Sequence, residues 1–327
     1  MSSLTSPFSV YLKGNFYLWE DLSMVSIGRF SQINALLQSK TVVVSALPFI
    51  IGFLYAGVTY HQINWWGSFW LLVACVAFHF AVNAHNQLSD YYRFHKDQQI
   101  EGSHNNVIQR FQIPLWVAKL TIISLVIFTA IIGLTLVYQT GVLLLIIGII
   151  SFLVGYFYSG GPYPILKTPL GEPVSGITMG FNIVFLGTYI NVATTVHVDG
   201  AFLGRMLLVA LPTILVISNL MLANNISDLV EDQRMGRHTL ITFIGQVNGC
   251  RLWRICYYLA YLAIAVGIGS HVLPFSTIVV FLTFPIVEKK INEFIHDPDK
   301  ATTFLNSIQI ILLILVSEII GLMLSLI

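Results

Sequence analysis

The sequence predicts an all-α, polytopic membrane protein with about nine transmembrane helices. Of its 327 residues, 56% are hydrophobic and 9% are charged, whereas an average soluble domain has about 25% charged residues. Apolar runs long enough to cross a bilayer, about 20 residues each, recur along the whole chain. The predicted partner is therefore the lipid bilayer, and the near-neutral net charge of +1 gives no indication of a nucleic-acid partner.

The apolar runs define the predicted helices. We expect helices at residues 41–60, 67–88, 113–137, 141–158, 173–193, 201–223, 252–268, 273–287 and 303–326. The chain has no repeat, low-complexity tract or appended soluble domain, so residues 1–327 are predicted to form one membrane domain. Within it, we expect an amphipathic, cytoplasmic N-terminal segment at residues 1–38 and a helical bundle at residues 39–327.

Positive charge is distributed unevenly between the two ends of the predicted helices. If the chain starts inside the cell, all of its 16 lysines and arginines except Arg205 fall on the cytoplasmic side, as the positive-inside rule requires. We therefore expect a multi-pass protein of the cell membrane with its N-terminus in the cytoplasm and its C-terminus outside. The two long polar connections, residues 89–112 and 224–249, then lie on the same face and can build one site.

The first polar connection begins with acidic and amide residues at the end of a predicted helix. Asp90 and Asp97 are seven residues apart, and Asn86 lies four residues before Asp90. If the helix continues to this point, these three side chains share one face. The first acidic segment, residues 86–97, is thus a candidate oxygen-rich surface.

The second acidic segment, residues 224–232, has a denser version of this pattern. Asn224, Asp228 and Asp232 follow at intervals of four residues, with Asn225 beside the first of them, so a helix presents them as one stripe. Carboxylates without a lysine on their own stripe repel each other unless a cation lies between them. Mg²⁺ binds a few carboxylates and keeps positions for water and phosphate oxygens. Two facing stripes therefore predict a Mg²⁺-bound diphosphate, with phosphate oxygens contacted by Arg93, Arg234, Arg237 and His238.

Other interpretations stay open on these residues alone. The acids can be ordinary solvated side chains at a membrane surface, the proton or cation carriers of a transporter, or part of a non-catalytic scaffold. A transporter is less favoured, because its ionisable groups usually lie near the midplane between inverted repeats. Glu318 does lie inside the last apolar run, where an acid is costly, so we expect it to face the bundle and find a partner.

The sequence resembles the UbiA superfamily of intramembrane aromatic prenyltransferases, and within it most closely the branch that acts on 1,4-dihydroxy-2-naphthoate. The resemblance spans roughly residues 35–327 and implies the nine-helix UbiA bundle around a central cavity. Its main support is the run Asn224-Asn-Ile-Ser-Asp228-Leu-Val-Glu-Asp232-Gln-Arg-Met-Gly236-Arg-His-Thr239-Leu240. Further agreement comes from Ser39-Lys40-Thr41, Gly155-Tyr-Phe-Tyr-Ser-Gly-Gly-Pro162, Leu170-Gly-Glu172 and Gly187-Thr-Tyr189.

The resemblance implies a reaction and a set of site residues. The reaction is transfer of a polyprenyl group from polyprenyl diphosphate to 1,4-dihydroxy-2-naphthoate with loss of CO₂, giving demethylmenaquinone for menaquinone biosynthesis. Mg²⁺ is the implied cofactor, with the ligands Asp90, Asp97, Asp228 and Asp232. Catalytic roles are implied for Asp90, Asp228, Asp232, Lys40 and Arg237, and substrate contacts for Asn86, Arg93, Asn224, Asn225, Tyr156, Tyr158 and Tyr189.

The first acidic segment departs from the pattern of the superfamily. Arg93 stands where a second acidic residue is expected, and the last acid is either Asp97, slightly displaced, or is replaced by Gln99. This departure leaves open another aromatic acceptor, such as 4-hydroxybenzoate, or a homologue of low activity.

Overall fold

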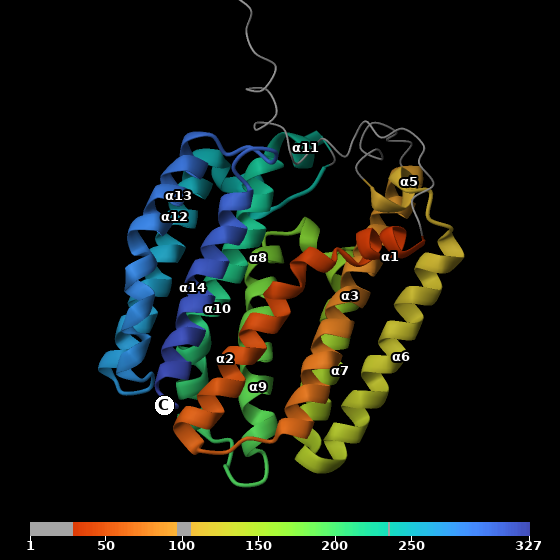
Figure 1. Cartoon of the computed structure of the whole chain (residues 1–327). Helices are drawn as coiled ribbons and strands as arrows, with labels where there is room; N and C mark the ends of the chain where they lie inside the picture. The colour runs from red at the N-terminus through yellow and green to blue at the C-terminus, as the bar shows by residue number, and fades with distance from the viewer. Residues whose placement is uncertain (1–28, 97–105, 235) are drawn as a thin grey trace, which may run out of the picture.

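The chain folds into a bundle of long helices (Figure 1). The structure is a computed structural model that describes residues 29–96, 106–234 and 236–327, and within these ranges all regular secondary structure is helical, as predicted. In chain order the elements are α1 (Arg29–Leu37), η2 (Ser39–Val42), α2 (Val43–Tyr60), α3 (Trp65–Lys96), α5 (Val107–Arg110), α6 (Leu115–Thr140), α7 (Val142–Ser159), η3 (Ile165–Lys167), α8 (Gly171–Ser175), η4 (Gly176–Phe181), α9 (Asn182–Val192), α10 (Gly200–Ser227), α11 (Leu229–Arg234), α12 (Leu240–Gly269), η5 (Phe275–Thr283), α13 (Phe284–His296) and α14 (Leu305–Leu324).

Within the described ranges, 8 helical spans are long and apolar enough to cross a membrane. They correspond to eight of the nine predicted helices. The ninth prediction, residues 273–287, falls on the 3₁₀ helix η5 and the start of α13. Because the chain changes from one helix type to another there, it forms no single long α-helix. The predicted number of about nine is therefore close to the observed architecture.

The largest departures from the predicted bounds are at the polar ends of the helices. α3 continues to Lys96 instead of ending at residue 88, and α12 begins at Leu240 instead of residue 252, with a kink at Gly245. Hydrophobicity reports only the part of a helix that lies in lipid. Both helices extend beyond that part, so the polar connections are more helical than predicted.

The core of the bundle is formed mainly by α2, α9, α10, α12, α13 and α14. Trp253 and Tyr257 of α12 and Phe202 of α10 are among its largest fully buried side chains. In contrast, only 17% and 11% of the residues in the spans of α6 and α7 are buried, against 61% in the span that contains α9. α6 and α7 form one side of the bundle (Figure 1), where exposed apolar side chains are suited to contact lipid.

A π-helical turn, η4, packs closely against α10. A Cβ atom added to Gly180 would lie 2.7 Å from the Cα atom of Ile214, and one added to Gly176 would lie 2.7 Å from the Ile214 carbonyl oxygen. Small residues let the backbones of membrane helices approach in this way. The close approach keeps α8, which carries Glu172, in contact with α10.

Two further predictions concern the N-terminal segment and Glu318. α1 contacts α3 at the end of the bundle where α5 and α11 also lie (Figure 1), whereas residues 1–28 lie outside the described residues. The division at residue 38 stays a prediction. Glu318 of α14 is fully buried, but neither of its carboxylate oxygens has a hydrogen-bond partner among the described residues.

Candidate active site

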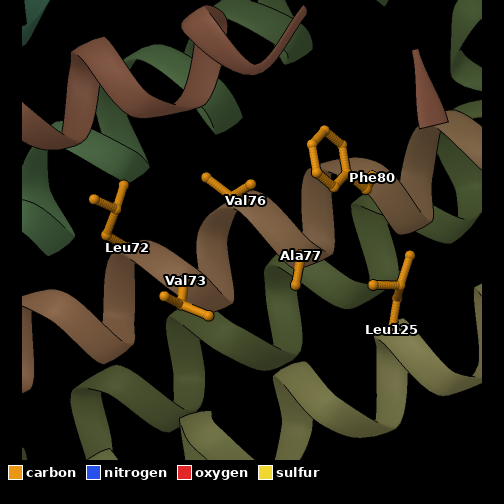
Figure 2. Close-up of a pocket in the computed structure, with 6 residues that line it drawn as sticks. All are labelled: Leu72, Val73, Val76, Ala77, Phe80 and Leu125. Carbon is orange, nitrogen blue, oxygen red and sulfur yellow. The ribbon is translucent and has the colours of Figure 1, made fainter. Parts of the chain in front are cut away.

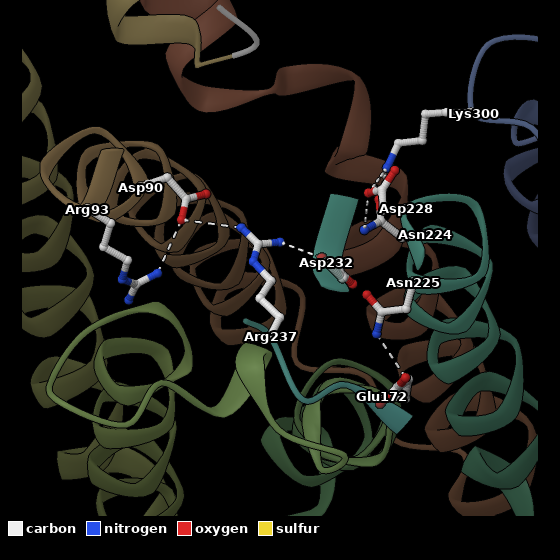
Figure 3. A network of polar contacts seen from close by, with 9 residues as sticks. All are labelled: Asp90, Arg93, Glu172, Asn224, Asn225, Asp228, Asp232, Arg237 and Lys300. Carbon is white, nitrogen blue, oxygen red and sulfur yellow. Dashed lines mark hydrogen bonds and ion pairs between the residues drawn. The ribbon is translucent and has the colours of Figure 1, made fainter. Parts of the chain in front are cut away.

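The two acidic segments meet at one end of the bundle (Figure 3). Arg237, which follows α11, lies between them. Its Nη1 atom is 3.1 Å from Oδ1 of Asp232 in α11, and its Nη2 atom is 3.9 Å from Oδ1 of Asp90 in α3. One guanidinium group therefore bridges carboxylates that are far apart in the sequence.

The position of Arg237 follows from the way α11 ends. Gly236 has φ 61°, in the left-handed region that favours glycine at the end of a helix. The Gly236 N–H donates to the Gln233 carbonyl at 3.2 Å, and the Arg237 N–H donates to the Asp232 carbonyl at 2.9 Å. These two bonds are those of a Schellman motif. The turn brings the Arg237 side chain back onto Asp232, 5 residues earlier in the chain.

The first acidic segment is held by Arg93. Its Nη1 atom donates to Asp90 Oδ1 at 3.1 Å, and its other terminal nitrogen donates to the Ser159 carbonyl at the end of α7. The Oδ1 atom of Asn86 is buried and has no hydrogen-bond partner among the described residues. Asp97 lies outside the described residues. Arg93 is thus in contact with Asp90, and it links α3 to α7.

The second acidic segment keeps its predicted stripe in part. Asn224 Nδ2 donates to Asp228 Oδ2 at 3.1 Å, which confirms that these two side chains share a face. The same carboxylate is 2.6 Å from Nζ of Lys300, which also donates to the Asn224 side-chain oxygen. Lys300 was not among the predicted site residues, because it lies 72 residues along the chain and no local pattern marks it.

Asp232 is the most deeply buried acid of this cluster. Its side chain is 1% exposed, and its Oδ2 atom has no hydrogen-bond partner among the described residues. Burial raises the pKa of Asp232 above its ordinary value, and the nearby Arg237 opposes part of this rise. A buried carboxylate oxygen without a partner is suited to bind a cation or a polar ligand group.

A second buried carboxylate, Glu172 of α8, lies behind the second acidic segment. Asn225 Nδ2 donates to Glu172 Oε1 at 2.8 Å, while Glu172 Oε2 is buried without a partner among the described residues. The buried hydroxyl of Tyr158, at the end of α7, lies near Glu172. Glu172 was not among the predicted site residues, although the Leu170-Gly-Glu172 run is part of the family resemblance.

Three further predicted site residues lie in different parts of the bundle. Lys40 is exposed in η2, ahead of α2. Tyr156 is 54% exposed and packs its ring against His85. Tyr189 donates to the Thr140 carbonyl at 2.7 Å, where α6 ends on the opposite side of the bundle from α11 (Figure 1). The placement of Tyr189 at the opposite end does not support a role in the site, whereas the roles of Lys40 and Tyr156 stay predictions.

The donor set fits Mg²⁺ as two half-sites. Among the described residues, no group of three His, Cys, Asp or Glu side chains surrounds one point. Mg²⁺ proteins usually need only one or two carboxylates, because water and substrate phosphates complete the octahedron. Asn224 with Asp228 supplies one pair of hard oxygen donors, and Asn86 with Asp90 supplies the other. The buried, unpartnered oxygens of Asn86 and Asp232 agree with such a use.

An apolar pocket lies further along α3 (Figure 2). Its volume is about 270 Å³, and its lining is Leu72, Val73, Val76, Ala77 and Phe80 of α3 with Leu125 of α6. Phe80 precedes Asp90 by ten residues, or about 15 Å of helix. No polar side chain contributes to the lining, so the pocket is suited to a hydrocarbon.

Comparison with known proteins identifies the family. The sequence profile of the UbiA prenyltransferase family matches residues 45–310. The chain belongs to this family. The predicted resemblance is therefore confirmed, and with it the assignment to membrane-embedded prenyltransferases that use prenyl diphosphates and aromatic acceptors.

Two curated members of the UbiA family share the same name. The chain is 26% identical over 263 residues to the 1,4-dihydroxy-2-naphthoate octaprenyltransferase of Bacillus subtilis (strain 168), with 80% of this chain and 81% of that protein covered. It is 26% identical over 217 residues to the 1,4-dihydroxy-2-naphthoate octaprenyltransferase of Mycobacterium leprae (strain TN), with 66% and 69% covered.

Solved UbiA structures share the fold. A UbiA homologue from Aeropyrum pernix K1 superposes with a TM-score of 0.66 at 16% identity, covering 84% of this chain and 97% of that chain. A UbiA homologue from Archaeoglobus fulgidus, bound to DMAPP and Mg²⁺, gives a TM-score of 0.59 at 13% identity, covering 89% and 99%. The predicted UbiA-like helical fold is thus confirmed.

Proposed function

We propose that this UbiA-family protein transfers a polyprenyl group from polyprenyl diphosphate to 1,4-dihydroxy-2-naphthoate with loss of CO₂, giving demethylmenaquinol, the reduced form of demethylmenaquinone. The observation that carries the proposal is the bridge from Asp90 through Arg237 to Asp232, which gathers both acidic segments at one end of an apolar bundle. The acceptor is supported by the names of the Bacillus and Mycobacterium relatives. It is also supported by the sequence pattern of residues 224–240.

The diphosphate is proposed to bind between the two acidic segments. Mg²⁺, when bound by their carboxylates and amides, neutralises charge that develops on the leaving diphosphate. Arg237, already held between two carboxylates, is placed to donate to phosphate oxygens as well. Arg93 keeps Asp90 in position and adds fixed positive charge at the same end of the bundle.

The aromatic acceptor is proposed to bind beside Tyr158 and Glu172. The Glu172 Oε2 atom lacks a protein partner among the described residues, and the buried hydroxyl of Tyr158 lies near both Glu172 and Ser175, so acceptor hydroxyl groups can hydrogen-bond to Tyr158 and Glu172. Glu172 Oε2 is placed to take a proton from a ring hydroxyl while the ring carbon attacks the prenyl group. The breaking C–O bond leaves its electrons on the diphosphate. The bond from the ring to the carboxylate then breaks, CO₂ leaves, and its electron pair restores the aromatic ring as a phenolate, which regains the proton from Glu172. Burial of both groups keeps water from the allylic cation.

The prenyl tail is proposed to run along α3 away from Asp90. The pocket between α3 and α6 lies in that direction, and its lining is apolar (Figure 2). Contact with hydrocarbon alone is sufficient there, because an isoprenoid chain has no polar group. The proposed orientation in the cell membrane keeps the N-terminus, and therefore the acidic segments, on the cytoplasmic side.

The test is a prenylation assay in membranes that contain the protein. Mg²⁺, 1,4-dihydroxy-2-naphthoate and farnesyl or geranylgeranyl diphosphate are supplied, and the prenylated, decarboxylated product is measured by mass spectrometry. We expect product that depends on Mg²⁺. Product only with 4-hydroxybenzoate or another phenol would replace the acceptor, whereas no product with any acceptor would overturn the proposed reaction.

A further inference from the structure

The segment between α13 and α14 places a lysine on the second acidic segment. Lys300 Nζ is 2.6 Å from Asp228 Oδ2, donates to the Asn224 side-chain oxygen, and lies 5.0 Å from the centre of the Phe304 ring. The turn that carries it is tightly bonded, because Asp299 Oδ1 accepts from the N–H groups of Ala301 at 2.8 Å and Thr302 at 2.9 Å. The lysine is therefore carried by a hydrogen-bonded turn. Its side chain reaches Asp228 and Asn224 (Figure 3).

The ammonium group occupies the oxygens that suit a divalent cation. The two oxygens that Lys300 contacts are the hard donors of one proposed half-site, and a cation that bound them would displace the ammonium. Lysine is suited to such an exchange, because its compact charge lies at the end of a flexible four-carbon chain. Its side chain is 40% exposed, so it has solvent into which to move.

We propose that Lys300 neutralises Asp228 before a divalent cation binds, and that it moves from Asp228 to an oxygen of the substrate diphosphate when the cation takes its place. This inference rests on the proposed function for the identity of the diphosphate ligand. It gives the segment between α13 and α14 a role in substrate positioning. Each charged group keeps an oppositely charged partner during the exchange. The divalent cation replaces the ammonium group on the carboxylate, and the ammonium group pairs with a phosphate oxygen.

The first test measures cation binding without any substrate. Mn²⁺ is titrated into the purified full-length protein in detergent, and free Mn²⁺ is measured by electron paramagnetic resonance. Lys300→Met removes the competing charge, so we expect Mn²⁺ to bind about threefold or more tightly, whereas Lys300→Arg keeps a competing charge on Asp228 and is expected to show no gain in Mn²⁺ affinity. The control is Lys289→Met, since Lys289 is 78% exposed on α13 and pairs with Glu293.

The second test measures the proposed contact between Lys300 and the diphosphate with an unreactive substrate analogue. Farnesyl S-thiolodiphosphate is titrated in saturating Mg²⁺, and we expect Lys300→Met to bind it about threefold or more weakly, with Lys300→Arg and Lys289→Met unchanged. Unaltered Mn²⁺ affinity in Lys300→Met, or tighter Mn²⁺ binding with unaltered affinity for the analogue, overturns the exchange. Wild-type protein that binds both ligands but leaves 1,4-dihydroxy-2-naphthoate unmodified overturns only the proposed acceptor.

Discussion

The two acidic segments use the same residue types but are neutralised differently. In the first segment, the single described carboxylate, Asp90, is in contact with two guanidinium groups, those of Arg93 and Arg237. In the second, Asp228 pairs with Lys300 and Asp232 pairs with Arg237. Arg237 is common to both segments, so the segments differ in their other partner, which is a guanidinium group in the first and an ammonium group in the second.

This difference indicates a division of work between the segments. A carboxylate that is held by two fixed guanidinium groups is a weaker cation ligand than one that faces a mobile lysine, since the competing charge cannot leave. The second segment is thus better suited to bind the divalent cation, and the first to attract the diphosphate. The arginine at position 93, which departs from the superfamily pattern, is consistent with that specialisation.

Asparagine substitutions test the comparison most directly. We expect Asp228→Asn and Asp232→Asn each to lower kcat/KM for the prenyl diphosphate by about 100-fold or more, because each removes a charged oxygen from the segment proposed to bind the metal. Asp90→Asn is expected to cost about tenfold, since its charge is already compensated. Steady-state assays in membranes with matched protein levels measure all three variants. Equal losses of kcat/KM in variants of the two segments would contradict the proposed difference between them.

The turn after α11 offers a smaller and sharper test. Gly236 has φ 61°, and a Cβ atom added to it would meet nothing within 4 Å, so Gly236→Ala meets backbone strain alone, about 1–2 kcal/mol. We expect about tenfold lower activity, because the strain opens the turn that places Arg237. Gly236→Asn is the matched control, since asparagine tolerates this conformation better. If both variants match the wild type, the turn does not position the arginine.

Because the carboxylate of Asp232 is buried, we expect the affinity for Mn²⁺ to change several-fold with pH. Burial raises the pKa of Asp232, so its metal-binding anionic form is lost at a higher pH than that of an exposed aspartate. We expect Mn²⁺ affinity to fall as the pH is lowered from roughly 7 to roughly 5, and to fall less steeply in Asp232→Asn. The stability of the metal-free protein changes with pH in the opposite direction. A raised pKa of a folded-state acid contributes stability at low pH and loses it as the pH rises through that pKa.

Parallel titrations and thermal unfolding scans of the two proteins separate these effects. A pH dependence of Mn²⁺ binding that is the same in the wild type and in Asp232→Asn would assign the titration to another group.

The sequence predicted the fold and the chemistry of the segments better than their contacts. Asn224 and Asp228 are four residues apart, and this spacing was sufficient to predict that they share a face, because the prediction depends only on helix geometry. Contacts between segments that are far apart in the sequence could not be predicted, and the contact of Lys300 with Asp228 is an example. Nor could apolar periodicity place Tyr156 and Tyr189, since membrane helices carry apolar residues on lipid-facing and core-facing sides alike.

Two neighbouring tyrosines at the end of α7 give the smallest predicted effect. Tyr158→Phe removes a buried hydroxyl beside Glu172 and the second acidic segment, and we expect the KM for the aromatic acceptor to rise about threefold while the KM for the prenyl diphosphate is unchanged. We expect the free energy of unfolding to fall by no more than about 1 kcal/mol, because the lost hydroxyl makes at most a weak contact with Ser175. Tyr156→Phe is the matched control, since Tyr156 is 54% exposed and packs on His85, on the side of the first acidic segment. Equal effects of the two changes would place the acceptor away from Glu172.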